Sequence, residues 1–197
     1  MIASIRHCVA LLAMTKTGTT AVESTLAPHC DIVMSGAPGL KHMTLKKFNR
    51  FVRPILTSAD SDIETVCVVR EPLDWLGSWY RYRRRSGIPN PYKSTAHVSF
   101  AEFVEAYLLP EPPQFARVGY PSKFVESAEG QMGVDHLFRY EEFDAFTAFL
   151  ETRFKRPLAF ARRNSSPKMA LDLPKNLKIR LETERATDFD LYERALR

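Results

Sequence analysis

Apolar and other strand-forming residues gather along the chain in short runs, which alternate with segments whose apolar positions follow the period of a helix. The two clearest runs, residues 2 to 13 and 64 to 69, each predict one buried strand, because strands of a parallel sheet are covered on both faces. Shorter runs at 31 to 34 and 134 to 139 predict two more strands. Strands that alternate with helices indicate an α/β fold, with three layers around a central, mainly parallel sheet.

Local start and stop signals predict the helices. One helix begins at Thr19 or Thr20, where Thr20 and Glu23 have capping-box spacing, and ends before Pro28. Another begins at Pro72. Its apolar face holds Leu73, Leu76 and Tyr80, and its opposite face holds Asp74, Ser78, Arg81 and Arg85. Further helices are predicted over 41 to 57, after a capping box at Ser99 and Glu102, over 143 to 154, and near 174 to 186 and 188 to 196.

The composition indicates the number of domains and the class of protein. The chain has 197 residues, 45% of them apolar and 26% charged, which is typical of a folded protein and predicts a single domain over residues 1 to 197. No run approaches the roughly 20 apolar residues that span a bilayer, so we expect no membrane anchor. Three cysteines without a CxxC pair indicate reduced thiols, a cytoplasmic location and no metal site.

The net charge of +5 and the pI near 9.2 favour an anionic ligand. Nucleic acid, membrane phosphates and a small phosphorylated ligand all fit this charge. The sequence contains no recognised nucleic-acid-binding motif, so we expect no nucleic-acid partner.

The segment TKTGTT at residues 15 to 20 lies between a predicted strand and a predicted helix N-terminus. Unpaired backbone N–H groups and the helix dipole favour an anion at such a place. Gly18 allows close approach of the backbone, and Lys16 adds a positive charge. The segment is not a Walker A loop, because its lysine precedes its glycine. Taken alone, such a segment is more typical of a polar strand-to-helix turn that carries a solvated lysine.

A second pair of polar residues follows another predicted strand. Arg70 comes at the end of the 64 to 69 run, and Ser78 lies eight residues further along, in the helix that begins at Pro72. Because the carboxyl ends of the strands line the ligand crevice of an open α/β sheet, we expect Arg70 and Ser78 to face the same cavity as Lys16. Together these residues would hold two anionic groups of one ligand.

At these two segments the sequence resembles the sulfotransferases that use 3′-phosphoadenosine 5′-phosphosulfate (PAPS). TKTGTT is similar to their PKTGTT-type loop, and REPLDWLGSWY at 70 to 80 is similar to their RNPxxRxxSxY motif. FRYEEF at 138 to 143, RRNSSPK at 162 to 168 and FDLYERAL at 189 to 196 resemble later segments of the family. The resemblance is to small bacterial members of the carbohydrate branch, and it implies their P-loop-NTPase-like fold and the transfer of a sulfuryl group to a hydroxyl or amine.

The resemblance also implies roles for individual residues. It assigns the 5′-phosphosulfate to Lys16, Thr17, Gly18, Thr19 and Thr20, the 3′-phosphate to Arg70 and Ser78, and further nucleotide contacts to Asn164 and Ser165. The product would be adenosine 3′,5′-bisphosphate (PAP), and no metal is implied. The chain departs from the family at Thr15, Glu71 and Trp75, which stand where proline, asparagine and arginine are common.

The reaction further needs a general base near neutral pKa to take the proton of the acceptor. His42 in LKHMTLKK is the leading candidate, because some members of the carbohydrate branch use a histidine in a similar segment. One alternative is that His42 is an exposed histidine at a helix start, and another is that a carboxylate such as Glu23 or Asp31 is the base.

The acceptor is a small molecule or a glycan that the sequence does not identify. An arginine cluster lies in the segment after Tyr80 and fits either an acidic-glycan site or a solvated helix face: Arg81, Arg83, Arg84 and Arg85. Two other functions remain open. The chain would be a P-loop-type kinase or NTPase if the loop held ATP, or an inactive nucleotide-binding homologue if Glu71 and Trp75 disturbed the donor site.

Overall fold

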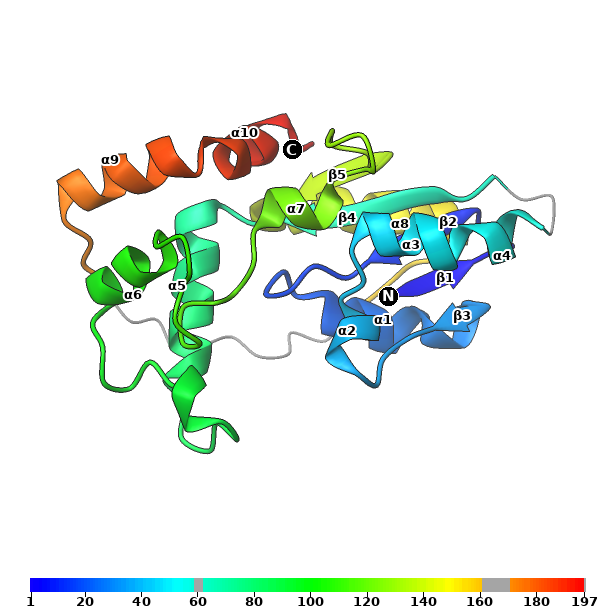
Figure 1. The fold of residues 1–197 in the computed structure, drawn as a ribbon. Helices are drawn as coiled ribbons and strands as arrows, with labels where there is room; N and C mark the ends of the chain where they lie inside the picture. Colours follow the sequence, from blue (N-terminus) through cyan, green and yellow to red (C-terminus); the bar gives the residue numbers. More distant parts are fainter. Residues whose placement is uncertain (59–61, 161–170, 197) are drawn as a thin grey trace.

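A five-stranded sheet forms the centre of the protein (Figure 1). The computed structural model describes residues 1–58, 62–160 and 171–196. The strand order is β3-β1-β2-β4-β5, in which β2, β4 and β5 are parallel and β1 is antiparallel to both of its neighbours. The strands are β1 (Ile2–Ser4), β2 (Val9–Leu12), β3 (Ile32–Val33), β4 (Glu64–Val69) and β5 (His136–Arg139). The α/β class is confirmed, but the sheet as a whole is mixed.

The predicted single strand over residues 2 to 13 is wrong, because this run is a β-hairpin of β1 and β2. The chain reverses between Ile5 and Cys8, where the N–H of Cys8 donates to the carbonyl of Ile5 at 3.1 Å. Cys8 has a positive φ of 50°, which only a few per cent of non-glycine residues adopt. The hairpin adds the antiparallel β1 to the sheet and places β2 between two partners.

The helices follow most of the local signals. The described residues include α1 (Thr19–Leu26), α2 (Pro38–Lys41), α3 (Leu45–Phe51), α4 (Arg53–Thr57), α5 (Pro72–Arg83), α6 (Phe100–Tyr107), α7 (Pro121–Val125), α8 (Phe143–Phe154), α9 (Lys175–Glu184) and α10 (Ala186–Arg194). The capping box at Ser99 and Glu102 is confirmed. The helix predicted over 41 to 57 is wrong as one element, because Lys41 ends α2 and α3 begins only at Leu45. The remaining residues divide at Val52 into α3 and α4, since the Pro54 in the first turn of α4 has no N–H to continue the hydrogen bonds of α3.

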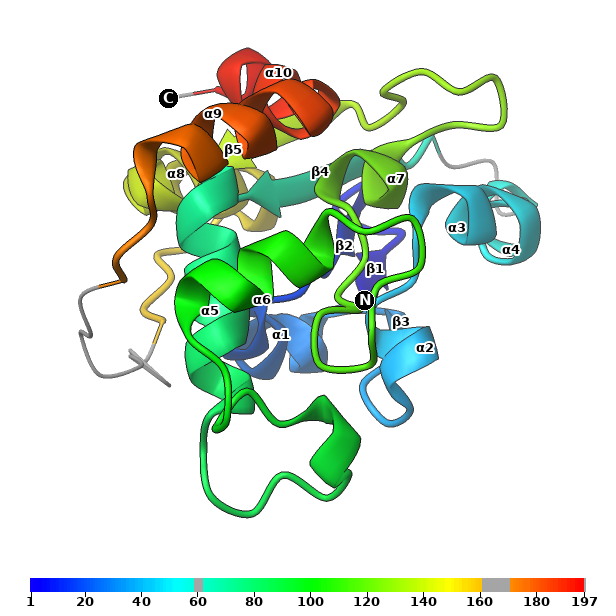
Figure 2. The same cartoon turned by 60° about the vertical axis from the view of Figure 1, so that its left-hand side comes forward.

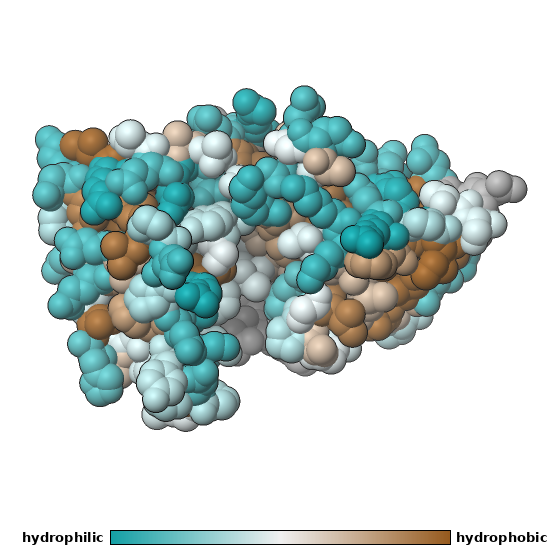
Figure 3. Space-filling view, in the orientation of Figure 1, coloured by the Kyte–Doolittle hydropathy of each residue, from teal (hydrophilic) through white to brown (hydrophobic). Residues whose placement is uncertain are grey.

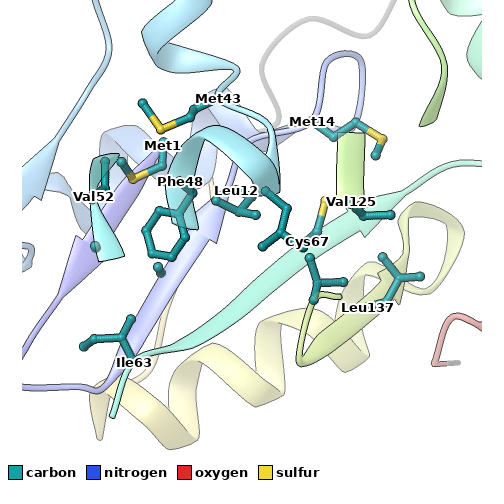
Figure 4. Packing of buried hydrophobic residues seen from close by; sticks show 14 of the residues in the cluster. Met1, Leu12, Met14, Met43, Phe48, Val52, Ile63, Cys67, Val125 and Leu137 are labelled. Carbon is teal, nitrogen blue, oxygen red and sulfur yellow. The ribbon is translucent and has the colours of Figure 1, made fainter. Parts of the chain in front are cut away.

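Helices cover both faces of the sheet, which gives three layers. On one face, α3, α4, α7 and α10 pack against the sheet; Figure 4 shows Phe48 of α3 near Leu12 and Cys67, which are register partners on β2 and β4. On the other face, α1 and α8 pack against the alternate strand positions, including Leu11 and Val68. The core is therefore divided by the sheet into two apolar clusters.

A third apolar cluster lies beyond the end of the sheet. It joins α5, α6 and α9 through residues such as Leu76, Phe103 and Leu181, and these helices lie together in Figure 2. Within the described ranges, no helix has both the length and the apolar character needed to cross a membrane.

Candidate functional site

The loop from Thr15 to Thr20 connects β2 to α1 and turns by means of two left-handed residues. Lys16 has φ 66° and Gly18 has φ 73°. A side chain at Gly18 would be strained by this φ and would bring its Cβ within 3.2 Å of the Tyr140 ring. Gly18 is also the N-cap of α1, and no side chain in the described part of the chain caps that helix end. The backbone N–H groups at the start of α1 are thus left for other acceptors.

The threonines of the loop do not all present their hydroxyl groups to a ligand. Thr17 and Thr19 are buried, and both hydroxyls donate to the carbonyl of Met14, at 2.9 and 3.4 Å. Thr20 is exposed, and its hydroxyl accepts a hydrogen bond from Nζ of Lys41 at 3.1 Å. The Thr17 and Thr19 side chains therefore shape the loop, and their hydroxyl groups are engaged within it.

The capping box predicted for Thr20 and Glu23 does not form. The carboxylate of Glu23 is buried and pairs instead with Nζ of Lys41, at 3.2 Å, and with the amine of Met1, at 2.6 Å. These partners are distant in sequence, so the local spacing did not reveal them.

Arg70 brings the second segment into contact with the loop. Its Nη1 donates to the carbonyl of Lys16 at 3.2 Å, and its guanidinium lies 4.5 Å from the centre of the Tyr140 ring. Nε and Nη2 of Arg70 bind one oxygen of Asp74, Oδ2, at 2.6 and 2.5 Å. The strand ends of β2 and β4 therefore meet at one place, as the sequence predicts.

Trp75 provides a second link between α5 and the loop. Its side chain is 2% exposed, and Nε1 donates to the carbonyl of Thr15 at 2.9 Å. Trp75 thus anchors the loop to α5. Sequence reasoning treated Trp75 as a disturbance of the donor site, and the structure gives it an anchoring role.

Glu71 also has a structural role. It is the N-cap residue of α5, and its carboxylate accepts from the backbone N–H of Asp74 at 2.7 Å. Burial raises the pKa of Glu71 above its ordinary value. Its carboxylate is therefore engaged with the N-terminus of α5.

One face of α5 continues the site. Ser78 is 4% exposed and lies one turn after Asp74. Arg81 lies a further turn along, and its Nη2 is at a distance of 3.2 Å from Oδ1 of Asp74. The helical face predicted for these residues is confirmed, whereas the importance of Asp74 was missed; its spacing of four residues from Arg70 was the available signal.

Lys16 lies against aromatic and cationic side chains of α5 and the residues after it. Its Nζ is 4.3 Å from the centre of the Tyr82 ring and 5.9 Å from that of Trp79. Burial, and then the positive charges of Arg85, Arg70 and Arg81, lower the pKa of Lys16 to about 8. Lys16 is therefore still mostly protonated at pH 7, but it gives up its proton more readily than an ordinary lysine.

The arginine cluster is divided by the fold. Arg83 is buried, and it donates to the carbonyls of three residues of a neighbouring loop: Gln114, Phe115 and Arg117. Arg84 donates to the Tyr80 hydroxyl and to backbone carbonyls. The solvated-face role predicted for the cluster is therefore wrong for the buried Arg83, whereas Arg84 is exposed and Arg81 and Arg85 lie toward Lys16.

His42 is tied to the strand that carries the loop. It is the C-cap residue of α2, and its Nδ1 lies 2.7 Å from the carbonyl of Ala13. A carbonyl only accepts, so Nδ1 carries the hydrogen and Nε2 keeps a lone pair in the neutral ring. Burial is the largest cause that lowers the pKa of His42, which keeps the ring neutral at pH 7.

The two carboxylates considered as alternative bases are placed differently. Glu23 is held in its ion pairs with Lys41 and Met1. Asp31 accepts a hydrogen bond from the N–H of Ile5 at 2.7 Å, in the turn at the edge of the sheet where β2 begins. The loop follows the other end of β2, so the structure separates Asp31 from it.

Two predicted contacts, Asn164 and Ser165, lie outside the described residues. Among the residues that are described, no group of three or more histidine, cysteine, aspartate or glutamate side chains is placed to hold a metal ion.

Figure 1 shows the loop, in blue, projecting toward α5, and the space-filling view shows a groove between the surface over α5 and α6 and the surface over α2 and α3 (Figure 3).

Comparison with known proteins adds no family to this geometry. No protein-family model matches the chain, and a search of curated proteins finds no significant match.

Proposed function

We propose that this protein is a sulfotransferase that transfers the sulfuryl group of PAPS to a hydroxyl or amine of a small-molecule or glycan acceptor. The observation that carries the proposal is the hydrogen bond from Nη1 of Arg70 to the carbonyl of Lys16, at 3.2 Å. It joins the two segments that would bind the two charged ends of the donor. Such a contact supports a ligand with phosphate groups at both ends more than it supports a ligand with one phosphate chain.

The charge around this contact suits a polyanion. Lys16, Arg70, Arg81 and Arg85 lie near one another, with Asp74 as the acid paired to two of them. The uncapped N-terminus of α1 adds N–H groups at the loop. PAPS, which carries a phosphosulfate and a separate phosphate, would neutralise this excess of positive charge.

Lys16 and His42 would carry the chemistry. The sulfur–oxygen bond to the 5′-phosphate breaks, and a new bond forms between sulfur and the hydroxyl oxygen or amine nitrogen of the acceptor. The acceptor's proton passes to Nε2 of His42, which is the ring nitrogen not engaged by Ala13. Lys16 stabilises the negative charge that develops on the leaving phosphate oxygen, and its lowered pKa lets it share a proton with that oxygen.

Two observations weigh against the other functions. A P-loop kinase needs its lysine at the start of the helix, whereas Lys16 comes before the N-cap Gly18. The inactive-homologue hypothesis rested on Glu71 and Trp75, and both have structural roles that leave Arg70 on the loop.

Thermal unfolding with different nucleotides tests the donor. PAP at about 100 times its Kd is expected to stabilise the fold by about 2.7 kcal/mol, which raises the Tm of a chain of this size by roughly 5–10 °C. ATP with Mg²⁺ is expected to give little change. A rise in Tm with ATP and none with PAP would contradict the sulfotransferase proposal and favour a kinase or NTPase.

Transfer itself requires an acceptor assay. A panel of phenols, amines and glycans would be incubated with labelled PAPS, and sulfated products would be detected by mass spectrometry. Lys16→Ala is expected to abolish product formation, whereas Lys47→Ala, which alters an exposed lysine on α3, is expected to keep it. Product formation by Lys16→Ala at the wild-type rate would show that Lys16 has no catalytic role.

A further inference from the structure

The carboxylate of Asp74 lies between two guanidinium groups. Its Oδ2 accepts from Nε and Nη2 of Arg70 at 2.6 and 2.5 Å, and its Oδ1 accepts from Nη2 of Arg81 at 3.2 Å. The arginine side chains are only 15% and 14% exposed, whereas the Asp74 side chain is 44% exposed. An acid at the surface therefore covers two cations that lie deeper.

We propose that Asp74 is an internal counter-ion in the position that the donor's 3′-phosphate takes, and that Arg81 is a further ligand of this phosphate. The inference rests on the proposed function, because that function supplies a ligand with a separate phosphate monoester. It assigns a phosphate-binding role to Arg81, and to Asp74 the role of a competitor for the same arginines. The resemblance to sulfotransferases implies neither role.

Arg81 qualifies because it shares an anion with Arg70. Both guanidinium groups reach the two oxygens of one carboxylate, so an anion of similar size in that place is within hydrogen-bond reach of both. Ser78 lies between Asp74 and Arg81 on the same face of α5 and is buried beside them. Two arginines and a serine would offer donors on several sides of a tetrahedral phosphate.

Asp74 qualifies as a removable partner because Arg70 has other contacts. The bond from Nη1 of Arg70 to the Lys16 carbonyl and the packing on the Tyr140 ring remain when Asp74 is withdrawn. A phosphate monoester carries up to two charges and three terminal oxygens, whereas the carboxylate carries one charge and two oxygens. The phosphate is thus the stronger partner for both arginines, and the exposed carboxylate can rotate toward water.

Asp74→Asn tests the counter-ion. The amide keeps the size of the side chain and removes its negative charge, so the affinity for PAP is expected to rise about tenfold at low ionic strength, measured by isothermal titration calorimetry. Asp144→Asn is the matched control, because Asp144 is the exposed acid in the first turn of α8. It changes the net charge equally and is expected to leave the affinity for PAP unchanged. Unchanged or weaker binding of PAP by Asp74→Asn would overturn the proposal.

Arg81→Gln tests the new ligand. Its affinity for PAP is expected to fall tenfold or more, whereas its affinity for adenosine 5′-monophosphate, which lacks the 3′-phosphate, is expected to stay the same. Arg50→Gln, at an exposed position on α3, is the charge-matched control. An equal loss of affinity for both nucleotides would show that Arg81 does not act on the 3′-phosphate.

Inorganic phosphate separates this inference from the proposed function. If the wild-type protein binds no PAP, the sulfotransferase proposal fails, and titration with inorganic phosphate then decides the anion site alone. Tighter phosphate binding by Asp74→Asn and weaker binding by Arg81→Gln would support the paired arginines as a phosphate site for another ligand. No change in phosphate binding in either variant would overturn that site as well.

Discussion

Replacement of Trp75 by phenylalanine tests whether α5 holds the Thr15–Thr20 loop in place. Nε1 of Trp75 donates to the Thr15 carbonyl at 2.9 Å, and the side chain is 2% exposed. Phenylalanine keeps an aromatic ring at this position but has no N–H. The variant therefore leaves the Thr15 carbonyl without its donor and leaves a gap where the larger indole was.

The expected cost combines these two effects. A buried carbonyl that loses its partner costs about 1–3 kcal/mol, and the lost volume of a buried ring adds roughly 1–2 kcal/mol. We expect the free energy of unfolding to fall by about 3 kcal/mol, which corresponds to a Tm decrease of roughly 6–12 °C for a chain of this length. The affinity for PAP is expected to fall as well, because the loop loses a fixed point.

Trp79→Phe is the matched control, one turn further along α5. Nε1 of Trp79 is buried and has no hydrogen-bond partner among the described residues. Its removal therefore costs volume and ring contacts but no hydrogen bond, and we expect a loss of about 1 kcal/mol.

The assay is urea unfolding followed by far-ultraviolet circular dichroism. Tryptophan fluorescence is unsuitable, because each variant removes one of the two tryptophans of the chain. Equal losses of stability in the two variants would refute the anchoring role of the Trp75 N–H.

Four further predictions concern single residues. Because the pKa of Lys16 is lowered to about 8, PAP binding should weaken as pH rises from 7 to 9, and titration calorimetry should show no such decline for Lys16→Arg, which stays charged. His42→Gln should lower kcat without changing the Kd for PAP, and on the acid side wild-type kcat should fall only below pH 6.5, since burial lowers the pKa of His42; an unchanged kcat in the variant would place the base elsewhere. Arg83→Met should cost about 3 kcal/mol in urea unfolding, because three partly buried hydrogen bonds to backbone carbonyls are lost. Glu71→Ala should cost about 1 kcal/mol through loss of the α5 cap, and a much larger loss of PAP affinity would contradict its structural role.

The parts of the fold with local signals could be predicted from the sequence. The strand Glu64–Val69 has an uninterrupted apolar run, and Pro72 and Ser99 mark helix starts by their own backbone and side-chain chemistry. Because Arg70 and Lys16 each follow a buried strand, their meeting at the sheet edge could also be predicted. Each of these inferences depends on neighbours in the sequence or on the geometry common to parallel sheets.

The remaining features depend on contacts between distant residues. The turn from Ile5 to Cys8 contains no glycine, proline, asparagine or aspartate. The residues that usually mark a turn are therefore absent from it. Glu23 has the spacing of a capping residue but pairs with Lys41. Arg83 has the spacing of a solvated face, and only the position of the 114 to 117 segment explains its burial.

The separation of the apolar clusters has a consequence for local unfolding of the protein. The Thr15–Thr20 loop follows β2, whose side chains pack in the two apolar clusters on the faces of the sheet. Trp75, which contacts this loop, packs in the cluster of α5, α6 and α9. If the α5–α6–α9 cluster unfolds as a cooperative unit of its own, amide hydrogens of α5 will exchange with solvent through an opening that costs less free energy than the opening of β2 and β4. A bound anion that contacts both units would close this route, so slower exchange in α5 would report on occupancy of the site.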